Sequence, residues 1–399
     1  MTKVYSKALD RTIEVERFIG HHQGMEKGPT LIFLAGIHGN EPAGIFALHQ
    51  ALDEINKRGL KIKGNVYALS GNLWALEKGV RYHKQDLNRL WTTEVLKKLL
   101  KNQLLPKDKD SIEQIELYHE ITNILKKEQG PFYFMDLHTT SGKTVPFALL
   151  NDSLLNRKFV AQYPVPLILG IEEYLEGPLL SYINELGYIA FGYESGQHDD
   201  LAAIQNHVAF IYLTLVFTGS LKKKEIDYRG YFKMLGQELG KTQEFYEIFY
   251  RYRVKEDENF VMRPGYSNFQ HLSKGQEIAI GNGGNILAHK KGKIFMPLYQ
   301  RQGREGFFII RKIPIFFLGL SSIMRKIQFD TILPCLPGVQ WLSPDRNALI
   351  VDKGTARFFS KPFFHLLGYR GKEIDETHLV VKNREKKSRK RTYRNAPWY

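Results

Sequence analysis

The stretch Leu31-Ile-Phe-Leu-Ala-Gly-Ile-His38-Gly-Asn-Glu41-Pro-Ala-Gly44 contains an apolar run, a glycine-containing turn and the start of a helical segment. An apolar run of this length, bounded by a turn signal, is typical of a buried strand. A strand that leads directly into a helix is the unit from which α/β domains are built. The stretch therefore predicts an α/β fold.

The rest of the first 220 residues repeats this alternation of short β-branched or aromatic runs with longer segments of helical period. The predicted strands are residues 30–35, 63–70, 132–137 and 188–194, and the predicted helices are residues 42–57, 111–127 and 201–217. We expect a mostly parallel or mixed sheet flanked by helices, forming a catalytic domain over residues 1–220. Ligands of such sheets usually bind beyond the carboxyl ends of the strands.

The remaining residues change in character. Phe245, Phe249 and Tyr252 stand at helical spacing, so residues 221–259 are predicted to form a helical connector. Residues 260–313 are interrupted by glycine and proline pairs, which indicates a smaller β-rich domain. Residues 314–381 give mixed signals, and no architecture is predicted for this extension. Residues 382–399 form a basic tail.

Bulk composition limits the possible functions. The single cysteine, Cys335, excludes an internal disulfide and a cysteine-rich zinc site, and any metal must use histidine and carboxylate ligands. The longest apolar runs are about half the roughly 20 residues that a membrane span needs. Residues 1–24 lack the pattern of a secretory signal, so a cytoplasmic protein is expected.

The formal net charge of +15 is concentrated near one end of the chain. Residues 382–394 hold eight basic residues and one acidic residue, a net of +7 out of +15. A tail of this kind can contact nucleic acid or an anionic membrane, but it is more often solvated and disordered. Nucleic-acid binding is therefore not the expected role.

His38 and Glu41 follow the first predicted strand and are three residues apart. An imidazole nitrogen and a carboxylate oxygen at this spacing can converge on one cation. The alternative is a surface histidine beside a glutamate that favours the positive end of a helix. This motif alone leaves both interpretations open.

A second apolar run, Phe132-Tyr-Phe-Met-Asp136-Leu-His138, also ends with a histidine. Asp136 and His138 point to the same side of an extended segment, so the carboxylate can orient the imidazole or its surroundings. Three protein ligands, His38, Glu41 and His138, with one open position form the catalytic arrangement for zinc. We therefore expect one zinc ion per catalytic domain. Glu194, at the end of another predicted strand, is the candidate for the base, unless it is an ordinary exposed glutamate.

Cations and amides gather in the stretch Arg81-Tyr-His-Lys-Gln-Asp86-Leu-Asn88-Arg89. An arginine fork matches a carboxylate, and an asparagine can donate beside it, which suits an anionic ligand. Alternatively, Asp86 and Arg89 form a local salt bridge that only fixes the loop.

Four motifs, taken together and in this order, resemble the succinylglutamate desuccinylase/aspartoacylase family, which is related to the zinc carboxypeptidases. The motifs are Gly-Ile-His38-Gly-Asn-Glu41, Arg81-Tyr-His-Lys-Gln-Asp86-Leu-Asn88-Arg89, Asp136-Leu-His138-Thr-Thr and Tyr-Glu194-Ser-Gly. The resemblance covers roughly residues 29–219, with a weaker similarity over residues 260–308. It implies a zinc carboxypeptidase-like fold.

The resemblance also implies a role for each site residue. His38, Glu41 and His138 would bind zinc, and Glu194 would activate water and return its proton to the leaving group. Arg81 would polarise the scissile carbonyl, and Asn88 and Arg89 would hold a substrate carboxylate.

Two features depart from the family pattern. Where aspartoacylases carry an arginine for a second substrate carboxylate, this chain has Asn184, so specificity for acyl-aspartate is not implied. The family's substrate tyrosine has no aligned counterpart, although Tyr299 is near.

The sequence thus predicts a zinc-dependent hydrolase that cleaves an amide or ester bond of a small, carboxylate-bearing substrate such as an N-acyl amino acid. One alternative is a zinc carboxypeptidase acting on a peptide or cell-wall fragment. Another is a catalytically inactive binding protein on the same fold. A pocket capped by residues 260–308 would favour a small substrate, whereas an open groove would favour a peptide.

Overall fold

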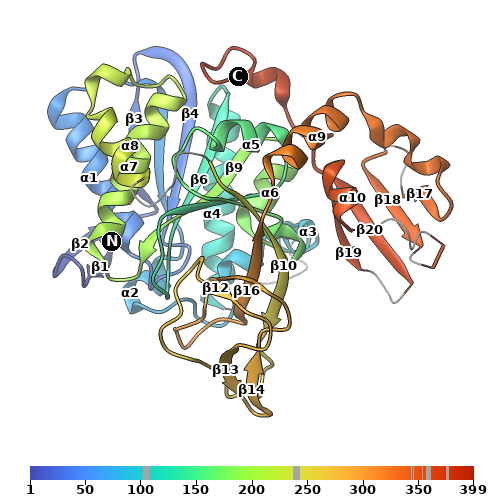
Figure 1. Cartoon of the computed structure of the whole chain (residues 1–399). Coiled ribbons are helices and arrows are strands. Elements are labelled where there is room, and N and C mark those ends of the chain that lie inside the picture. The colour runs from blue at the N-terminus through green and yellow to red at the C-terminus, as the bar shows by residue number, and fades with distance from the viewer. Residues whose placement is uncertain are drawn as a thin grey trace.

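The computed structural model describes residues 1–101, 108–236, 243–342, 344, 346–352, 354–355, 361–373 and 377–399 (Figure 1). A large mixed sheet runs through the centre of the molecule, in the strand order β12-β15-β16-β10-β8-β7-β9-β6-β4-β5-β3. The α/β fold with a mixed sheet flanked by helices is therefore confirmed.

The four predicted strands lie next to one another towards the β3 edge of this sheet, and the three predicted helices are also present. The strands are β4 (Glu26–Ala35), β5 (Lys63–Ser70), β6 (Phe132–Thr140) and β9 (Ile189–Gln197). β5, β4, β6 and β9 are mutually parallel neighbours. The helices are α1 (Ala43–Arg58), α4 (Lys109–Lys127) and α7 (Leu201–Phe217). The carboxyl ends of β4, β6 and β9 consequently meet at one edge.

Side chains alternate between two apolar layers along each strand, as the pleat requires. On one face, residues such as Phe33, Met135 and Phe191 pack against α1, α7 and α5 (Leu154–Val160). On the other face, Leu34 and Phe134 pack against α4 and α6 (Leu179–Glu185). His138 and Glu194 belong by alternation to this second face, the face of α6.

Shorter elements complete residues 1–236, which include the expected catalytic domain and are called the catalytic part. These are β1 (Thr2–Ser6), β2 (Arg11–Val15), β3 (Phe18–Gln23), α2 (Leu73–Lys78), η1 (Leu87–Arg89), α3 (Thr93–Leu100), β7 (Phe147–Leu150), β8 (Leu167–Leu169), η2 (Ile171–Glu173), η3 (Lys223–Glu225) and α8 (Tyr228–Gly236). β1 and β2 form a separate hairpin, whereas β3 closes one edge of the large sheet.

The prediction of helix around Phe245, Phe249 and Tyr252 is wrong. Residues Phe245–Arg253 form strand β10, which pairs with β8 and with β16 (Glu305–Lys312). Tyr246 and Ile248 alternate into an apolar cluster and are almost fully buried, and this tertiary burial outweighs the helical spacing of the aromatic residues. Helix does occur earlier in the segment, as α8, and residues 237–242 lie outside the described residues.

The β-rich character of residues 260–313 is confirmed, but part of the segment extends the large sheet. β12 (His271–Leu272), β15 (Gly292–Phe295) and β16 pair in series at its far edge. β11 (Val261–Met262), β13 (Glu277–Gly281) and β14 (Gly284–Leu287) form a separate three-stranded sheet. The loop between β15 and β16 is thereby brought to the catalytic part.

The C-terminal extension has its own small core. Its four-stranded antiparallel sheet has the order β17-β18-β20-β19. Its elements are α9 (Ile315–Lys326), η4 (Phe329–Cys335), β17 (Val339–Trp341), β18 (Ala348–Asp352), α10 (Lys361–Leu366), β19 (Tyr369–Glu373) and β20 (His378–Asn383). In Figure 1 this orange and red unit stands beside the catalytic part, and the chain then returns to it.

The expectation of a solvated, disordered basic tail is wrong. The Tyr393 side chain, in η5 (Lys390–Tyr393), is fully buried, and its hydroxyl accepts a hydrogen bond from the Ile189 backbone at 3.0 Å. The indole of Trp398 donates to the Tyr133 hydroxyl at 3.0 Å, and Lys387 pairs with Glu185 at 2.6 Å. Aromatic residues interspersed among the basic ones anchor the tail, and acidic groups of the catalytic part neutralise some of its charge.

None of the helices in the described ranges combines the length and apolar composition that a membrane-spanning segment requires.

Candidate active site

His38 and Glu41 lie in the turn between β4 and α1, and His138 lies near the end of β6. The turn packs tightly against the first turns of α2. A Cβ atom at Gly39 would lie 2.0 Å from the carbonyl carbon of Ala75, so no side chain fits there. Because β4 and β6 are parallel neighbours, their ends place all three side chains in one buried cluster.

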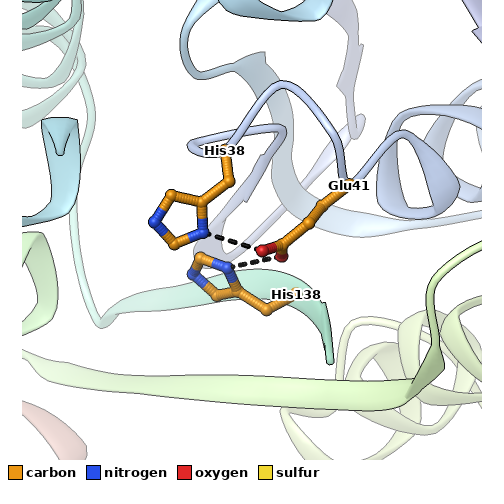
Figure 2. Close-up of side chains that lie close together, drawn as sticks. All are labelled: His38, Glu41 and His138. Carbon is orange, nitrogen blue, oxygen red and sulfur yellow. Dashed lines mark hydrogen bonds and ion pairs between the residues drawn. The ribbon is translucent and has the colours of Figure 1, made fainter. Parts of the chain in front are cut away.

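The three side chains converge through specific atoms, as Figure 2 shows. Glu41 lies between the two imidazoles: its Oε1 is 2.9 Å from His38 Nδ1, and its Oε2 is 3.0 Å from His138 Nδ1. One potential ligand atom from each residue falls within 4.8 Å of the others. This spread is compatible with a single ion bound at about 2 Å from each ligand atom.

The remaining nitrogen of each imidazole faces another carboxylate. His38 Nε2 lies 3.1 Å from Asp86 Oδ1, and His138 Nε2 lies 2.8 Å from Asp136 Oδ2. Histidine ligands of metals characteristically present their second nitrogen to a carboxylate, carbonyl or water, which fixes the ring orientation. Asp136 therefore lies where the sequence places it, whereas the contact of Asp86 with His38 was not expected.

Electrostatic coupling inside the cluster is strong. Burial alone would raise the pKa of the Glu41 carboxyl, but His38 and His138 outweigh it and hold this pKa well below its ordinary value. Burial would lower the pKa of His138, yet Asp136 and Glu41 hold it well above its ordinary value. Glu41 and His138 thus favour their charged forms despite their burial.

Arg81 lies in the loop of residues 81–89, and its side chain connects this loop to the cluster. Its guanidinium lies 3.4 Å from Glu41 Oε1 through Nη1 and 3.2 Å from Asp86 Oδ2 through Nη2. Asp110, at the start of α4, fixes the loop by accepting hydrogen bonds from the backbone N–H groups of His83, Lys84 and Gln85 at 2.7–3.0 Å. The loop conformation is therefore set by a fully buried carboxylate that the sequence analysis did not single out.

Asn88 and Arg89 line the same pocket as the cluster. The side-chain oxygen of Asn88 accepts a hydrogen bond from the Leu179 backbone at 2.9 Å, so the amide nitrogen remains as a donor. Arg89 Nη2 lies 3.3 Å from Glu305, and Arg89 Nη1 is only within 4.0 Å of Asp86. The local ion pair between Asp86 and Arg89 is thus present, and Glu305 is the nearer acidic partner of Arg89.

Glu194 lies beside His138 in the register of β6 and β9, and it lines the pocket. Its side chain is 3% exposed, and its Oε2 has no hydrogen-bond partner among the described residues. Burial, reinforced by the Glu41 charge and opposed by His138 and Arg81, raises the pKa of Glu194 to about 8. An ordinary exposed glutamate is therefore not what the structure shows.

Several pocket residues were not found from the sequence. His198 Nε2 donates to Gln300 Oε1 at 3.1 Å, and its Nδ1 lies 2.7 Å from the Thr139 hydroxyl. Burial lowers the pKa of His198, which favours this neutral form. His198 follows the carboxyl end of β9 directly, a position that could have drawn attention to it. Gln300 and Glu305 come from the region of β15 and β16, where no sequence pattern marks them.

The two departures noted in the sequence occupy positions outside this pocket. Asn184 donates to the Ala190 carbonyl at 3.0 Å and accepts from Asn156 at 2.6 Å. The Tyr299 hydroxyl donates to the Arg263 carbonyl at 2.7 Å and accepts from the Tyr266 backbone at 3.0 Å. Both side chains therefore form hydrogen bonds with neighbouring residues outside the pocket.

A family model described as the succinylglutamate desuccinylase/aspartoacylase catalytic domain matches residues 27–209. The succinylglutamate desuccinylase of Pseudomonas syringae pv. tomato is 41% identical over 69 residues, which are 17% of this chain and 21% of that protein. The one from Photorhabdus laumondii subsp. laumondii is 40% identical over 77 residues, 19% of this chain and 23% of that protein. In these alignments the chain spans about a fifth of the length of the curated relatives.

Solved structures share the fold over a larger part of the chain. The succinylglutamate desuccinylase of Vibrio cholerae has a TM-score of 0.53 at 16% identity, covering 72% of this chain and 82% of that one. The succinylglutamate desuccinylase/aspartoacylase of Rhodobacter sphaeroides has a TM-score of 0.54 at 15% identity, covering 74% and 88%.

The matched residues 27–209 contain all four sequence motifs and every residue of the His38, Glu41 and His138 cluster. Through these residues, the chain matches the catalytic domain of the succinylglutamate desuccinylase/aspartoacylase family.

Proposed function

We propose that the protein is a zinc-dependent hydrolase that cleaves the amide, or ester, bond of a small acylated substrate bearing a carboxylate, such as an N-acyl amino acid. The observation that carries the proposal is the convergence of His38, Glu41 and His138 in the pocket that Arg81 and Glu194 also line. The match of residues 27–209 to a family whose named relatives include succinylglutamate desuccinylases supports the same reaction class.

The donor set fits zinc. Two imidazoles and one carboxylate, with a fourth position open, form a known catalytic zinc arrangement. Each imidazole presents its Nδ1 to Glu41 and its Nε2 to a second carboxylate. Loss of the Nδ1 proton would leave Nδ1 free to bind a cation, while the Nε2–H group still donates to the second carboxylate. When bound, zinc supplies a Lewis acid and lowers the pKa of a coordinated water towards roughly 7.

Arg81 and Glu194 would carry out the proton and charge chemistry. The buried guanidinium of Arg81 is held by Glu41 and Asp86 and can donate to the oxygen of a scissile carbonyl as negative charge develops on it. Glu194 has a free, buried carboxylate oxygen in the same pocket, as a general base requires. It would take a proton from the attacking water and deliver it to the leaving nitrogen or oxygen.

Asn88 and Arg89 would hold the substrate carboxylate. The free amide N–H groups of Asn88 and the fork of Arg89 are suitable donors. Because Arg89 already contacts Glu305, a substrate carboxylate must share or displace that partner.

A small substrate is favoured over a peptide. The side chains of Met296, Leu298 and Gln300, from the loop between β15 and β16, line the pocket together with the cluster. Asn40 donates to Gln300 at 2.8 Å, and the Arg81 backbone N–H donates to the Gln302 side chain at 3.0 Å. These hydrogen bonds hold the loop against the two segments that contain the cluster residues and Arg81. A pocket covered in this way leaves less room for an extended chain than an open groove.

The Glu194→Gln variant tests the proposal. Glutamine is nearly isosteric but cannot accept the proton, so turnover of N-acyl amino acids should fall about a hundredfold or more while zinc content stays normal. Zinc analysis and steady-state kinetics on the same preparation separate the outcomes. Loss of zinc together with activity would make Glu194 structural, and full activity would remove it from the mechanism.

A further inference from the structure

One strand leads from the catalytic centre into the rest of the pocket. Glu194, Gly192 and Ala190 alternate along β9, so they share one face, and all three line the pocket. At about 3.3 Å per residue, Ala190 lies roughly 13 Å along the strand from Glu194. The pocket thus extends well beyond the metal ligands.

The surroundings of this part of the pocket are apolar. We call it the apolar lobe and define it by the side chains of Leu149, Ile171, Leu175, Leu180, Ala190 and Phe308. Gly192 opens the space between them. A Cβ atom at position 192 would lie 3.4 Å from Leu180 Cδ1 and 3.7 Å from Leu149 Cβ, so side chains larger than alanine would project into the lobe.

Charge compensation for an acidic group is lacking in the apolar lobe. The lysine and arginine side chains among the described residues lining the pocket are Arg81 and Arg89, and both already face carboxylates. Asn151 and Ser181, neutral lining residues, are hydrogen-bonded to each other at 3.1 Å. A carboxylate seated in the lobe would lose hydration without gaining a cationic partner.

The lobe adjoins the residues proposed to hold the substrate carboxylate. The oxygen of Asn88 binds the Leu179 backbone, directly before Leu180, and the backbone of Arg89 packs against Gly177. In an amino acid, the carboxylate and the side chain branch from the same carbon. A substrate whose carboxylate lies at Asn88 and Arg89 would therefore direct its side chain towards the apolar lobe.

We propose that the apolar lobe selects N-acyl amino acids with aliphatic or aromatic side chains over those with acidic ones, and that Gly192 and Leu180 determine this preference. The inference rests on the proposed function, because it assumes that Asn88 and Arg89 hold the carboxylate. Each methylene transferred from water into such a lobe favours binding by about fourfold.

The test uses the zinc-loaded full chain and the N-acetyl derivatives of phenylalanine, leucine, alanine, aspartate and glutamate. The expected kcat/KM for the phenylalanine or leucine compound is at least about tenfold higher than for either acidic compound. Equal or faster hydrolysis of the acidic compounds would overturn the inference while leaving the proposed function intact.

Two variants connect the preference to the lobe. Gly192→Leu should lower the ratio of kcat/KM for phenylalanine over alanine at least about tenfold, since the new side chain fills the lobe. Gly192→Ala, whose Cβ meets only ordinary contacts, is the matched control and should change that ratio little. Thermal unfolding of both variants checks that they fold. An unchanged ratio in folded Gly192→Leu protein would contradict the assignment.

Binding provides a readout that does not depend on turnover. Calorimetry with the Glu194→Gln chain can measure binding of two sets of ligands, the same N-acetyl compounds and the free amino acids. In each set, the phenylalanine or leucine compound should bind at least about tenfold more tightly than the aspartate or glutamate compound. If the wild type hydrolyses none of the compounds but this order of binding holds, the proposed function fails and the lobe assignment stands. If no such order appears, the lobe assignment fails.

Discussion

At the scale of single residues, the candidate site is built from pairs in which one group orients the next. His138 faces Glu41 with one nitrogen and Asp136 with the other, and His38 is held in the same way between Glu41 and Asp86. The rings are therefore fixed before any ligand arrives, and a prepared site loses less free energy to ordering when it binds.

Asp136→Asn tests this orientation. The substitution keeps the size of the side chain but removes the charge beside His138, so zinc affinity should fall about tenfold or more. Competition with a chromophoric chelator measures the change. Asp53→Asn, on the exposed face of α1, is the control and should leave the affinity unchanged. An Asp136→Asn protein with wild-type zinc affinity would show that the carboxylate does not support the ligand.

Sequence patterns could place His38, Glu41, His138 and Glu194 because each follows or ends an apolar strand, and parallel strands bring their carboxyl ends together. They could not place Glu305 beside Arg89, which is 216 residues away, because nothing local records that contact. They suggested the pair between Asp86 and Arg89, which is present at 4.0 Å, but not the shorter contacts of Asp86 with His38 and Arg81.

At the scale of elements, the loop from Arg81 to Arg89 depends on one helix start. Asp108 caps α4 by accepting from the Ser111 backbone at 3.0 Å, and Asp110, in the first turn, accepts three backbone hydrogen bonds from the loop. A carboxylate that satisfies several buried N–H groups is expensive to remove.

Asp110→Ala should therefore loosen the loop. It leaves the N–H groups of His83, Lys84 and Gln85 without their acceptor, and each buried unpaired group costs about 1–3 kcal/mol. We expect the free energy of unfolding to fall by about 3 kcal/mol, with a larger effect on turnover than on zinc content because the ligands themselves are not touched. Chemical denaturation, zinc analysis and kinetics provide the readouts. Wild-type stability and turnover would contradict this role of Asp110.

Elements were predictable where local pattern and tertiary burial agree. β5 and α7 have the predicted bounds, since their apolar residues are buried as their periodicity indicates. β10 was not predictable, because Phe245, Phe249 and Tyr252 stand at the spacing typical of a helix. The residues of this strand that are buried in the core are instead Tyr246 and Ile248. The extension was not predictable either, since its strands are short and β18 pairs with β20, which follows α10 and β19 in the chain.

At the scale of the whole molecule, a buried ionic cluster joins the extension to the catalytic part. Asp152, which follows β7, contacts Arg157 of the catalytic part at 2.8 Å, and Arg325 and Arg370 of the extension at 3.0 and 2.6 Å. Arg325 also lies 3.2 Å from Glu385. Asp152 directly follows Asn151, which lines the pocket. The extension therefore contacts the catalytic part next to the pocket.

This cluster predicts a pH dependence. Burial would raise the pKa of Asp152, but Arg157, Arg325 and Arg370 outweigh it and hold this pKa well below its ordinary value. The contribution of the ionised Asp152 to the free energy of unfolding is fully present above about pH 4, the ordinary pKa of an aspartate in an unfolded chain. This contribution is lost as the pH falls further. Thermal unfolding between pH 6 and about pH 3 should therefore show a falling midpoint.

Asp152→Asn isolates the contribution of the carboxylate. It removes the charge that titrates while keeping the size of the side chain, so the variant should be less stable at pH 6, by about 3–5 kcal/mol, and should lose less stability on acidification. Asp53→Asn again serves as an exposed control. A variant whose midpoint falls with pH as steeply as that of the wild type would assign the acid sensitivity to other carboxyl groups.

Zinc stoichiometry decides whether His38, Glu41 and His138 together hold one catalytic zinc ion. Elemental analysis would compare the purified full chain with the His138→Ala variant after zinc loading and removal of excess metal. We expect close to one zinc per wild-type chain and essentially none in a folded His138→Ala chain. A wild-type chain that retains no zinc, or a variant that keeps a full equivalent, would contradict this expectation.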